Sequence, residues 1–158
     1  MGAPRLPPLK VPTDPAVLGY LAGLVDGEGS IGITSAFQRG KSRSRSHTLR
    51  VSITNTSETL IAWLSDTIGG GLRLKRDSRK ANWKPGYDWM LYAAQAEQVL
   101  LAVLPYLVIK RDQARIALEF RAVGRGGWVG RALDPVVVEK REALKQKIHL
   151  LNARGIAN

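Results

Sequence analysis

The sequence predicts an α+β fold in which the elements follow in the order αββαββα, with an additional helix at the C-terminal end. Three observations predict it: apolar residues recur at helical spacing in several segments, apolar and polar residues alternate in others, and glycine or proline stands at most of the boundaries. The chain has 158 residues, 44% of them hydrophobic, which suits one domain with a buried core. We expect an extended, proline-rich arm at residues 1–13 and a single domain over residues 14–158.

The first helix is expected to begin at Asp14 and Pro15, because an aspartate accepts hydrogen bonds from free helical N–H groups and a proline favours the first turn. It should cover residues 16–25 and end in the sequence DGEG, since closely spaced glycines oppose helix continuation. Asp134 and Pro135 repeat the same start signal later in the chain. The other helices are expected at residues 57–68, 95–107 with a break at Pro105, 110–121 and 135–152, the last after a glycine-rich link at 124–130.

Strands are expected at residues 30–38, 48–54, 72–75 and 87–93. The second of them shows the pattern most clearly, because Leu49, Val51 and Ile53 alternate with polar residues. Such alternation gives a strand with one apolar and one polar face.

The composition limits the chemistry that the chain can perform. It contains no cysteine and only two histidines, which removes disulfides, zinc fingers and cysteine nucleophiles and leaves oxygen ligands for any metal site. The formal net charge of +11 favours a polyanionic partner, with nucleic acid ahead of an anionic membrane surface. No apolar run reaches the ~18–20 residues of a membrane-spanning helix, and the proline-rich start is unlike a signal peptide, so we expect a soluble intracellular protein.

The first helix and the acidic turn after it carry the most informative pattern. Gly19, Gly23 and Gly27 recur at every fourth position, which leaves one helix face almost without side chains. Two such helices can pack backbone to backbone, which would bring the following acidic residues near one axis. An ordinary buried helix is the alternative, although each glycine costs a helix ~1 kcal/mol relative to alanine. A calcium-binding EF-hand is excluded, because Leu24 and Ser35 would occupy its first and last ligand positions.

The sequence LAGLVDGEG at residues 21–29 resembles the signature of the LAGLIDADG homing endonucleases. Three further segments, at residues 52–56, 68–71 and 104–113, resemble later segments of that family in the same order. The resemblance covers about residues 14–121. It implies a curved antiparallel sheet that enters the DNA major groove, with helices on the other side, and metal-dependent hydrolysis of double-stranded DNA.

The same resemblance assigns roles to individual residues. Glu28 would be the metal-binding carboxylate, helped by the backbone carbonyl of Gly27. Asn55 matches the position that orders water near the metal, and Lys110 matches a lysine that stabilises charge or tunes the attacking water. A turn or cap residue is the alternative for Asn55, and a solvated lysine is the alternative for Lys110. Asp26 is expected to brace the helix junction, Mg²⁺ to support cleavage, and Ca²⁺ to support binding without cleavage.

The chain contains one signature, and family members with one signature resemble half-enzymes that act as homodimers. We therefore expect an intron-encoded type of homodimer with Gly19, Ala22 and Gly23 at its centre, which cuts a long pseudo-palindromic site to staggered ends. A non-catalytic nucleic-acid binder, such as an intron-splicing maturase, is the alternative. Retention of Glu28 favours the enzyme. A basic peripheral membrane protein ranks last, because no helix combines an apolar face with a basic one.

Side chains of two kinds are expected to contact the duplex. Those on the sheet would read base edges, and those at the hairpin tips would contact phosphates, although a merely solvated basic surface is the alternative. The expected sheet residues are Thr34, Gln38, Arg50, Ser52, Thr54, Arg73 and Lys75, with Tyr87 or Asp88 according to register. The expected loop residues are Arg39, Lys41, Arg43, Arg45, Arg76, Arg79, Lys80 and Lys84.

Overall fold

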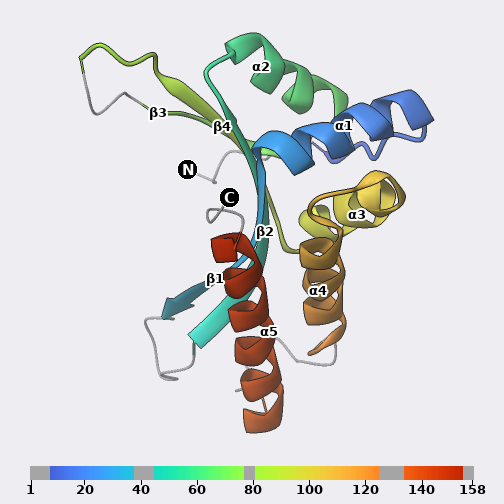
Figure 1. The fold of residues 1–158 in the computed structure, drawn as a ribbon, viewed down its shortest axis with the longest axis vertical. Coiled ribbons are helices and arrows are strands. Elements are labelled where there is room, and N and C mark those ends of the chain that lie inside the picture. Colours follow the sequence, from blue (N-terminus) through green and yellow to red (C-terminus); the bar gives the residue numbers. More distant parts are fainter. Residues whose placement is uncertain (1–7, 38–44, 77–80, 125–133, 155–158) are drawn as a thin grey trace.

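The computed structural model describes residues 8–37, 45–76, 81–124 and 134–154. Over these residues the predicted order αββαββα is confirmed, followed by a short 3-10 turn and two more helices (Figure 1). The elements are α1 Pro15–Glu28, β1 Gly29–Phe37, β2 Arg45–Asn55, α2 Glu58–Thr67, β3 Leu72–Arg76, β4 Gly86–Tyr92, α3 Ala93–Val103, η1 Leu104–Tyr106, α4 Arg111–Ala122 and α5 Pro135–Arg154. Most of the predicted glycine-rich link, residues 125–130, lies outside the described part of the chain.

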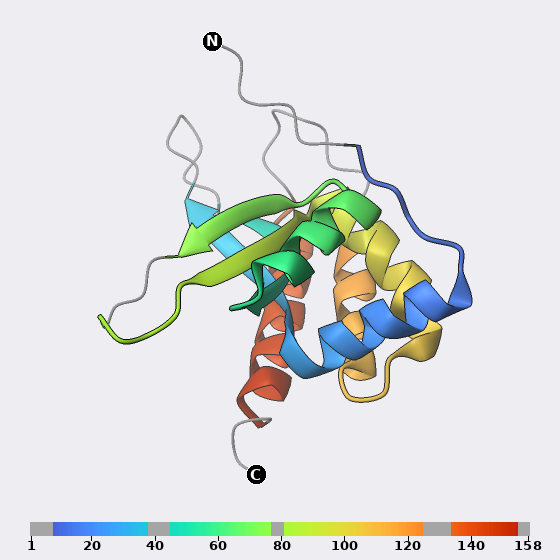
Figure 2. The same cartoon turned by 90° about the horizontal axis from the view of Figure 1, so that it is seen from above.

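The four strands form one antiparallel sheet in the order β1-β2-β4-β3. Figures 1 and 2 show the helices gathered on one side of this sheet, while no described helix covers its other side. We call the uncovered side the open face. The expected α+β arrangement, with helices on one side of an antiparallel sheet, is therefore confirmed.

The pairing register shows which residues share a face, because residues directly opposite each other in an antiparallel pair point the same way. Ile31 lies opposite Val51, which lies opposite Leu91, and all three are fully buried beneath the helices. The predicted apolar row of the second strand is confirmed, since Leu49 and Ile53 are fully buried as well. The polar residues that alternate with this row lie on the open face.

Helix α1 is longer than the sequence predicted, because it continues through the acidic turn to Glu28. Gly27 is tolerated inside it at an exposed position where an added Cβ would meet nothing within 4 Å. Gly29 then ends the helix, and its backbone N–H donates to the carbonyl of Val25. A Cβ at Gly29 would lie 2.6 Å from both the Cα and the carbonyl oxygen of Val25, so this glycine permits a close turn from α1 into β1.

The predicted break at Pro105 and two predicted helix starts are confirmed. The helix expected at 95–107 is α3 up to Val103, followed by the 3-10 turn, since Pro105 cannot donate the next helical hydrogen bond. The starts at Asp14 and Asp134 are confirmed, because their side chains accept from the backbone N–H groups of Ala16 and Val136, each at 2.8 Å.

The two terminal segments both pack on the domain. The described part of the arm is joined to the end of α2, since the backbone N–H of Lys10 donates to the carbonyl of Ile68 at 2.6 Å. Helix α5 buries Leu144 and Ile148, and its Asn152 donates to the carbonyl of Ile31 at 3.0 Å. Within the described residues, no helix is long and apolar enough to cross a membrane.

Candidate active site

Glu28 lies at the end of α1 with its side chain exposed. The side-chain amide of Asn55, the last residue of β2, donates a hydrogen bond to Oε2 of Glu28. The Oδ1 atom of Asn55 accepts from the backbone N–H of Ser57 at 2.7 Å, which closes a turn before α2. Because that bond occupies the oxygen end of the amide, the N–H₂ end faces Glu28. The turn before α2 and the hydrogen bond to Glu28 therefore use opposite ends of the same Asn55 amide.

Asp26 fixes the neighbouring junction between α1 and the start of α4. Its two carboxylate oxygens accept from the backbone N–H groups of Val108 and Lys110, each at 2.8 Å. Burial acts to raise the pKa of Asp26, but these backbone hydrogen bonds and the charge of Lys110 outweigh it and hold that pKa below its ordinary value. The expectation that Asp26 braces the helix junction is confirmed.

Lys110 is half-buried between the same two helices. Its ammonium nitrogen donates to the carbonyl of Val25 at 3.0 Å and to the carbonyl of Asp26 at 2.5 Å. These carbonyls belong to the last turn of α1, where a cation offsets the negative end of the helix dipole. Burial lowers the pKa of Lys110, and the charge of Asp26 opposes that shift. The alternative of a freely solvated lysine is therefore wrong.

The donor atoms at the end of α1 suit a divalent cation only in part. Glu28 offers an exposed carboxylate, Gly27 offers a backbone carbonyl in open surroundings, and such oxygen donors match Mg²⁺ or Ca²⁺. Among the residues that the structure describes, no three acidic or histidine side chains gather into a metal-binding group.

The fold with this arrangement occurs in known structures, although no family model and no curated protein matches the chain. The homing endonuclease I-CvuI, solved with a DNA target, matches with a TM-score of 0.70 and 22% identity over 86% of this chain and 82% of that chain. The archaeal intron-encoded homing endonuclease I-Vdi141I, complexed with DNA, matches with a TM-score of 0.70 and 16% identity over 86% and 84%. The LAGLIDADG homing endonuclease I-SmaMI, bound to cleaved DNA, matches with a TM-score of 0.66 and 19% identity over 81% of this chain and 42% of that chain.

The chain has the LAGLIDADG homing-endonuclease fold. The predicted fold is confirmed, and at these identities the likeness establishes the fold alone.

In this LAGLIDADG fold, the register decides which predicted sheet residues lie on the open face. Thr34, Arg50 and Thr54 do, as expected. Thr34 and Thr54 are exposed, whereas Ser52 on the same face is only 9% exposed.

The second pair of strands differs from the expectation. Position 73 lies opposite Trp89 and position 75 lies opposite Tyr87, so Arg73 and Lys75 occupy the helix-covered side of the register and not the open face. The reason is that Trp89 is fully buried beneath the helices, which fixes the phase of β4 and hence of β3. The open choice between Tyr87 and Asp88 falls to Asp88, which lies opposite Thr54.

The expected loop cations are only partly described. Lys84 is exposed before β4, while Arg45 begins β2 and Arg76 ends β3. The remaining residues expected to contact DNA lie outside the described part of the chain: Gln38, Arg39, Lys41, Arg43, Arg79 and Lys80.

The glycine face of α1 is open, but one of its expected members is not on it. An added Cβ at Gly19, Gly23 or Gly27 would meet nothing within 4 Å. Ala22, in contrast, is fully buried in the core together with Leu21, so it lies on the core side of α1 and not on the glycine face. The buried residues of α1 are spaced three or four positions apart, as on one face of a helix. Ala22 belongs to this set and not to the glycine series.

The sequence analysis did not predict the exposure of two apolar residues near the end of α1. Val108 is 79% exposed and Ile109 is 71% exposed, and both stand in the segment whose backbone is bound by Asp26. The available signal was an apolar pair directly before Lys110. Exposed apolar residues beside a bare helix face are typical of a surface that meets another protein.

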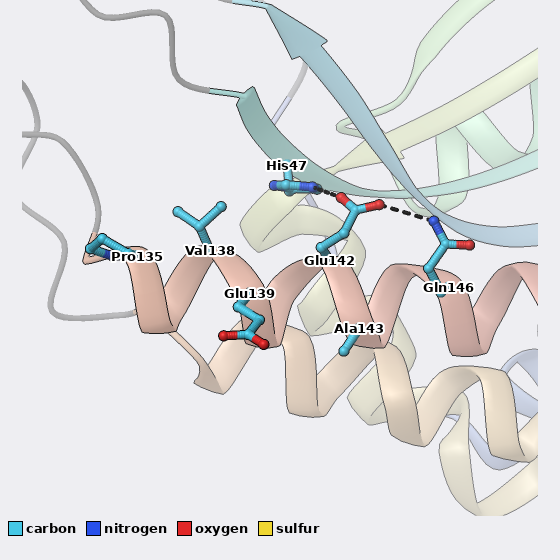
Figure 3. A pocket seen from close by; sticks show the side chains of 7 residues that line it. All are labelled: His47, Pro135, Val138, Glu139, Glu142, Ala143 and Gln146. Atoms are coloured by element: carbon cyan, nitrogen blue, oxygen red, sulfur yellow. Dashed lines mark hydrogen bonds and ion pairs between the residues drawn. The ribbon is translucent and has the colours of Figure 1, made fainter.

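A separate hollow of about 670 Å³ lies at the other end of β2, under α5 (Figure 3). There His47, only 6% exposed, shares a 2.7 Å hydrogen bond between its Nε2 and Oε2 of Glu142. The hydrogen bonds from Gln146 and His47, opposed by burial, lower the pKa of Glu142 to about 2. His47 and Asn55 are eight residues apart on an extended strand, so this hollow is separate from the Glu28 site.

Proposed function

We propose that this chain is a site-specific, metal-dependent endonuclease of double-stranded DNA that acts as a homodimer. The observation that carries the proposal is the exposed carboxylate of Glu28, held by Asn55 where α1 leads into β1. The proteins I-CvuI, I-Vdi141I and I-SmaMI, which have the same fold, were solved with DNA, and this supports a duplex as the partner.

The charge of the chain supports the same partner. A formal net charge of +11 attracts a polyanion, and Arg50 and Lys84 belong to the open face and to the hairpin beside it. Much of the affinity is then electrostatic, so it falls steeply as salt concentration rises. The basic loop residues 39–45 and 76–84 remain proposed phosphate contacts.

The proposed chemistry is hydrolysis without a covalent enzyme intermediate. A magnesium ion held by the Glu28 carboxylate and the Gly27 carbonyl would neutralise charge at the scissile phosphate and activate a water. Asn55 keeps the Glu28 carboxylate in place and is the proposed water-ordering group. Lys110 holds the end of α1 and is the proposed charge-stabilising group.

Two strands must be cut, and one chain carries one Glu28. A two-fold axis beside α1 would place the Glu28 carboxylate of a second copy next to the first, one for each strand of the duplex. Gly19 and Gly23 offer a bare helix face for this contact, and the exposed Val108 and Ile109 extend it.

The homodimer is tested with Gly23→Leu, whose side chain would occupy the space needed by the partner helix. We expect the variant to be monomeric in light scattering and to lose cleavage. Val11→Leu, an exposed change on the arm, is the control. An intact, active Gly23→Leu dimer would contradict the proposed interface.

The activity is tested on DNA that contains the proposed insertion site. This site is the sequence formed when the two flanks of the intron or intein that encodes the protein are joined directly. We expect double-strand cleavage with Mg²⁺ and binding without cleavage with Ca²⁺. Binding in both ions with cleavage in neither would favour the alternative, a non-catalytic nucleic-acid binder such as a maturase.

A further inference from the structure

The open face of the sheet contains an almost buried acid, Asp88. It is 3% exposed and lies directly opposite Thr54, whose hydroxyl donates to Oδ1 of Asp88 at 2.6 Å. A carboxylate is unfavourable on a face that we propose meets DNA phosphates. Its presence there therefore needs a physical reason, and the hydrogen bond to Thr54 provides one.

The hydrogen bond fixes what Thr54 presents to the outside. A hydroxyl has one proton to donate, and Thr54 donates it to Oδ1 of Asp88, so that proton is not available to a ligand. Thr54 itself is exposed on the open face. What it offers to a ligand is thus an oxygen that accepts a hydrogen bond, together with its methyl group.

Bases in the major groove differ in this respect. Adenine and cytosine present amino groups that donate, whereas guanine and the thymine carbonyl present acceptors. We propose that Asp88 makes Thr54 an obligate acceptor and so sets a preference for the amino group of adenine or cytosine at one base position. The inference rests on the proposed function, because it needs the open face to bind duplex DNA. In this scheme Thr54 contacts the base, and Asp88 is a positioning residue.

The position of this base follows from the strand. Thr54 directly precedes Asn55, which holds Glu28, so the base lies in the inner part of each half-site, close to the cleaved bond. Thr34 lies opposite Thr48, six residues from Thr54 along β2. At ~3.3 Å per residue this is about 20 Å, or roughly six base pairs with the strand along the groove.

Thr34 provides a matched comparison on the same face. Its hydroxyl donates to the carbonyl of Thr48 at 3.2 Å, a longer and weaker bond than that of Thr54. Because a neutral carbonyl holds the proton less firmly than a carboxylate, Thr34 can turn its hydroxyl to either kind of base. Thr34 should therefore show a weaker preference among the four bases than Thr54.

Two substitutions distinguish the contact that Thr54 makes with the base from the effect of Asp88 on the Thr54 hydroxyl. Thr54→Val keeps the shape and removes the acceptor, so the preference at the inner position should weaken on the order of tenfold. Asp88→Asn replaces one carboxylate oxygen with an amide N–H₂ that can donate to Thr54, which would free the hydroxyl proton to point outward. The preference should then move toward guanine or thymine at that same position.

The experiment uses the full chain and a pool of random-sequence duplexes with Ca²⁺, followed by sequencing of the bound DNA. We expect Asp88→Asn to change the preferred base at one inner position of each half-site, Thr54→Ser to retain it, and Thr34→Val to change only a position about six base pairs further out. A purely structural role of Asp88 would weaken binding to all sequences alike without changing the preferred base.

The outcomes distinguish the two proposals. A wild-type motif that neither Thr54→Val nor Asp88→Asn alters at any position overturns this inference and leaves the proposed function standing. If the wild-type chain enriches no motif, both fail. Should Asp88→Asn not fold, the contrast between Thr54→Val and Thr54→Ser decides: equal motifs overturn the inference, and a preference lost only in Thr54→Val supports it.

Discussion

Both ends of strand β2 hold a carboxylate from a helix distant in sequence, but in opposite surroundings. At one end Asn55 donates to Glu28, which is exposed at the tip of α1. At the other end His47, only 6% exposed, is bonded to Glu142 on α5 at 2.7 Å. A carboxylate left in solvent keeps its capacity to bind a cation, whereas one bonded to a buried imidazole is committed to holding two elements together. We therefore expect the first to govern activity and the second to govern stability.

The largest effect is expected from Glu28→Gln. The amide keeps the size of the side chain but removes its charge, so we expect cleavage to fall by at least about a hundredfold while DNA affinity and thermal unfolding stay near the wild type. Cleavage rates and melting temperatures measure this. Asp66→Asn, an exposed acid on α2, is the matched control and should leave cleavage unchanged. Undiminished cutting by Glu28→Gln would remove Glu28 from the mechanism.

Glu142→Ala should give the converse result. It leaves the buried Nε2 of His47 without its partner, so the free energy of unfolding should fall by about 1–3 kcal/mol with cleavage per folded molecule preserved. Urea titration measures the loss. Glu139→Ala, an exposed change on the same helix, should stay within ~0.5 kcal/mol of the wild type. Equal stability of the two variants would contradict the structural role of Glu142.

Asn55→Ala should affect both properties, because Asn55 serves both Glu28 and the turn before α2. We expect a roughly tenfold to hundredfold loss of cleavage, with about 1 kcal/mol lost from the free energy of unfolding. Asn152→Ala, which removes a hydrogen bond between α5 and β1, should lower stability without the loss of cleavage. Equal cleavage by the two variants would place Asn55 outside the active site.

The smallest effect concerns pH. The pKa of Glu142 falls from an ordinary 4.5 to about 2 in the folded chain, through its hydrogen bonds to Gln146 and His47. A lowered carboxyl pKa stabilises the fold above the ordinary value, and this contribution disappears as pH falls from about 4.5 toward 2. The difference in unfolding free energy between the wild type and Glu142→Gln should therefore shrink over that range. A constant difference from pH 6 to pH 2 would argue against the shift.

Local sequence signals predicted most of the helices and strands. Asp14 and Pro15 identified the start of α1, and the alternation around Val51 identified a strand that buries one side, because both depend on residues within a few positions of each other. The resemblance to the LAGLIDADG family, and not a local signal, assigned the brace to Asp26. Its hydrogen bonds with the backbone N–H groups of Val108 and Lys110 confirm this expectation.

Other features depended on partners far along the chain. Alternation in β3 showed that neighbouring residues point to opposite sides, but the face given to Arg73 was wrong because the pairing with Trp89 decides it. By its spacing, Ala22 can belong either to the glycine face of α1 or to its buried face. Only the packing of the helix shows that Ala22 lies in the core.

The sequence by itself determined the elements and their order, since spacing and capping act over one or two turns or strands. Only the tertiary structure decided the phase of the second strand pair, the bond of His47 to Glu142 and the pairing of Thr54 with Asp88. The two hydrogen bonds join residues 95 and 34 positions apart, and no local pattern records which side of a strand such a partner will occupy.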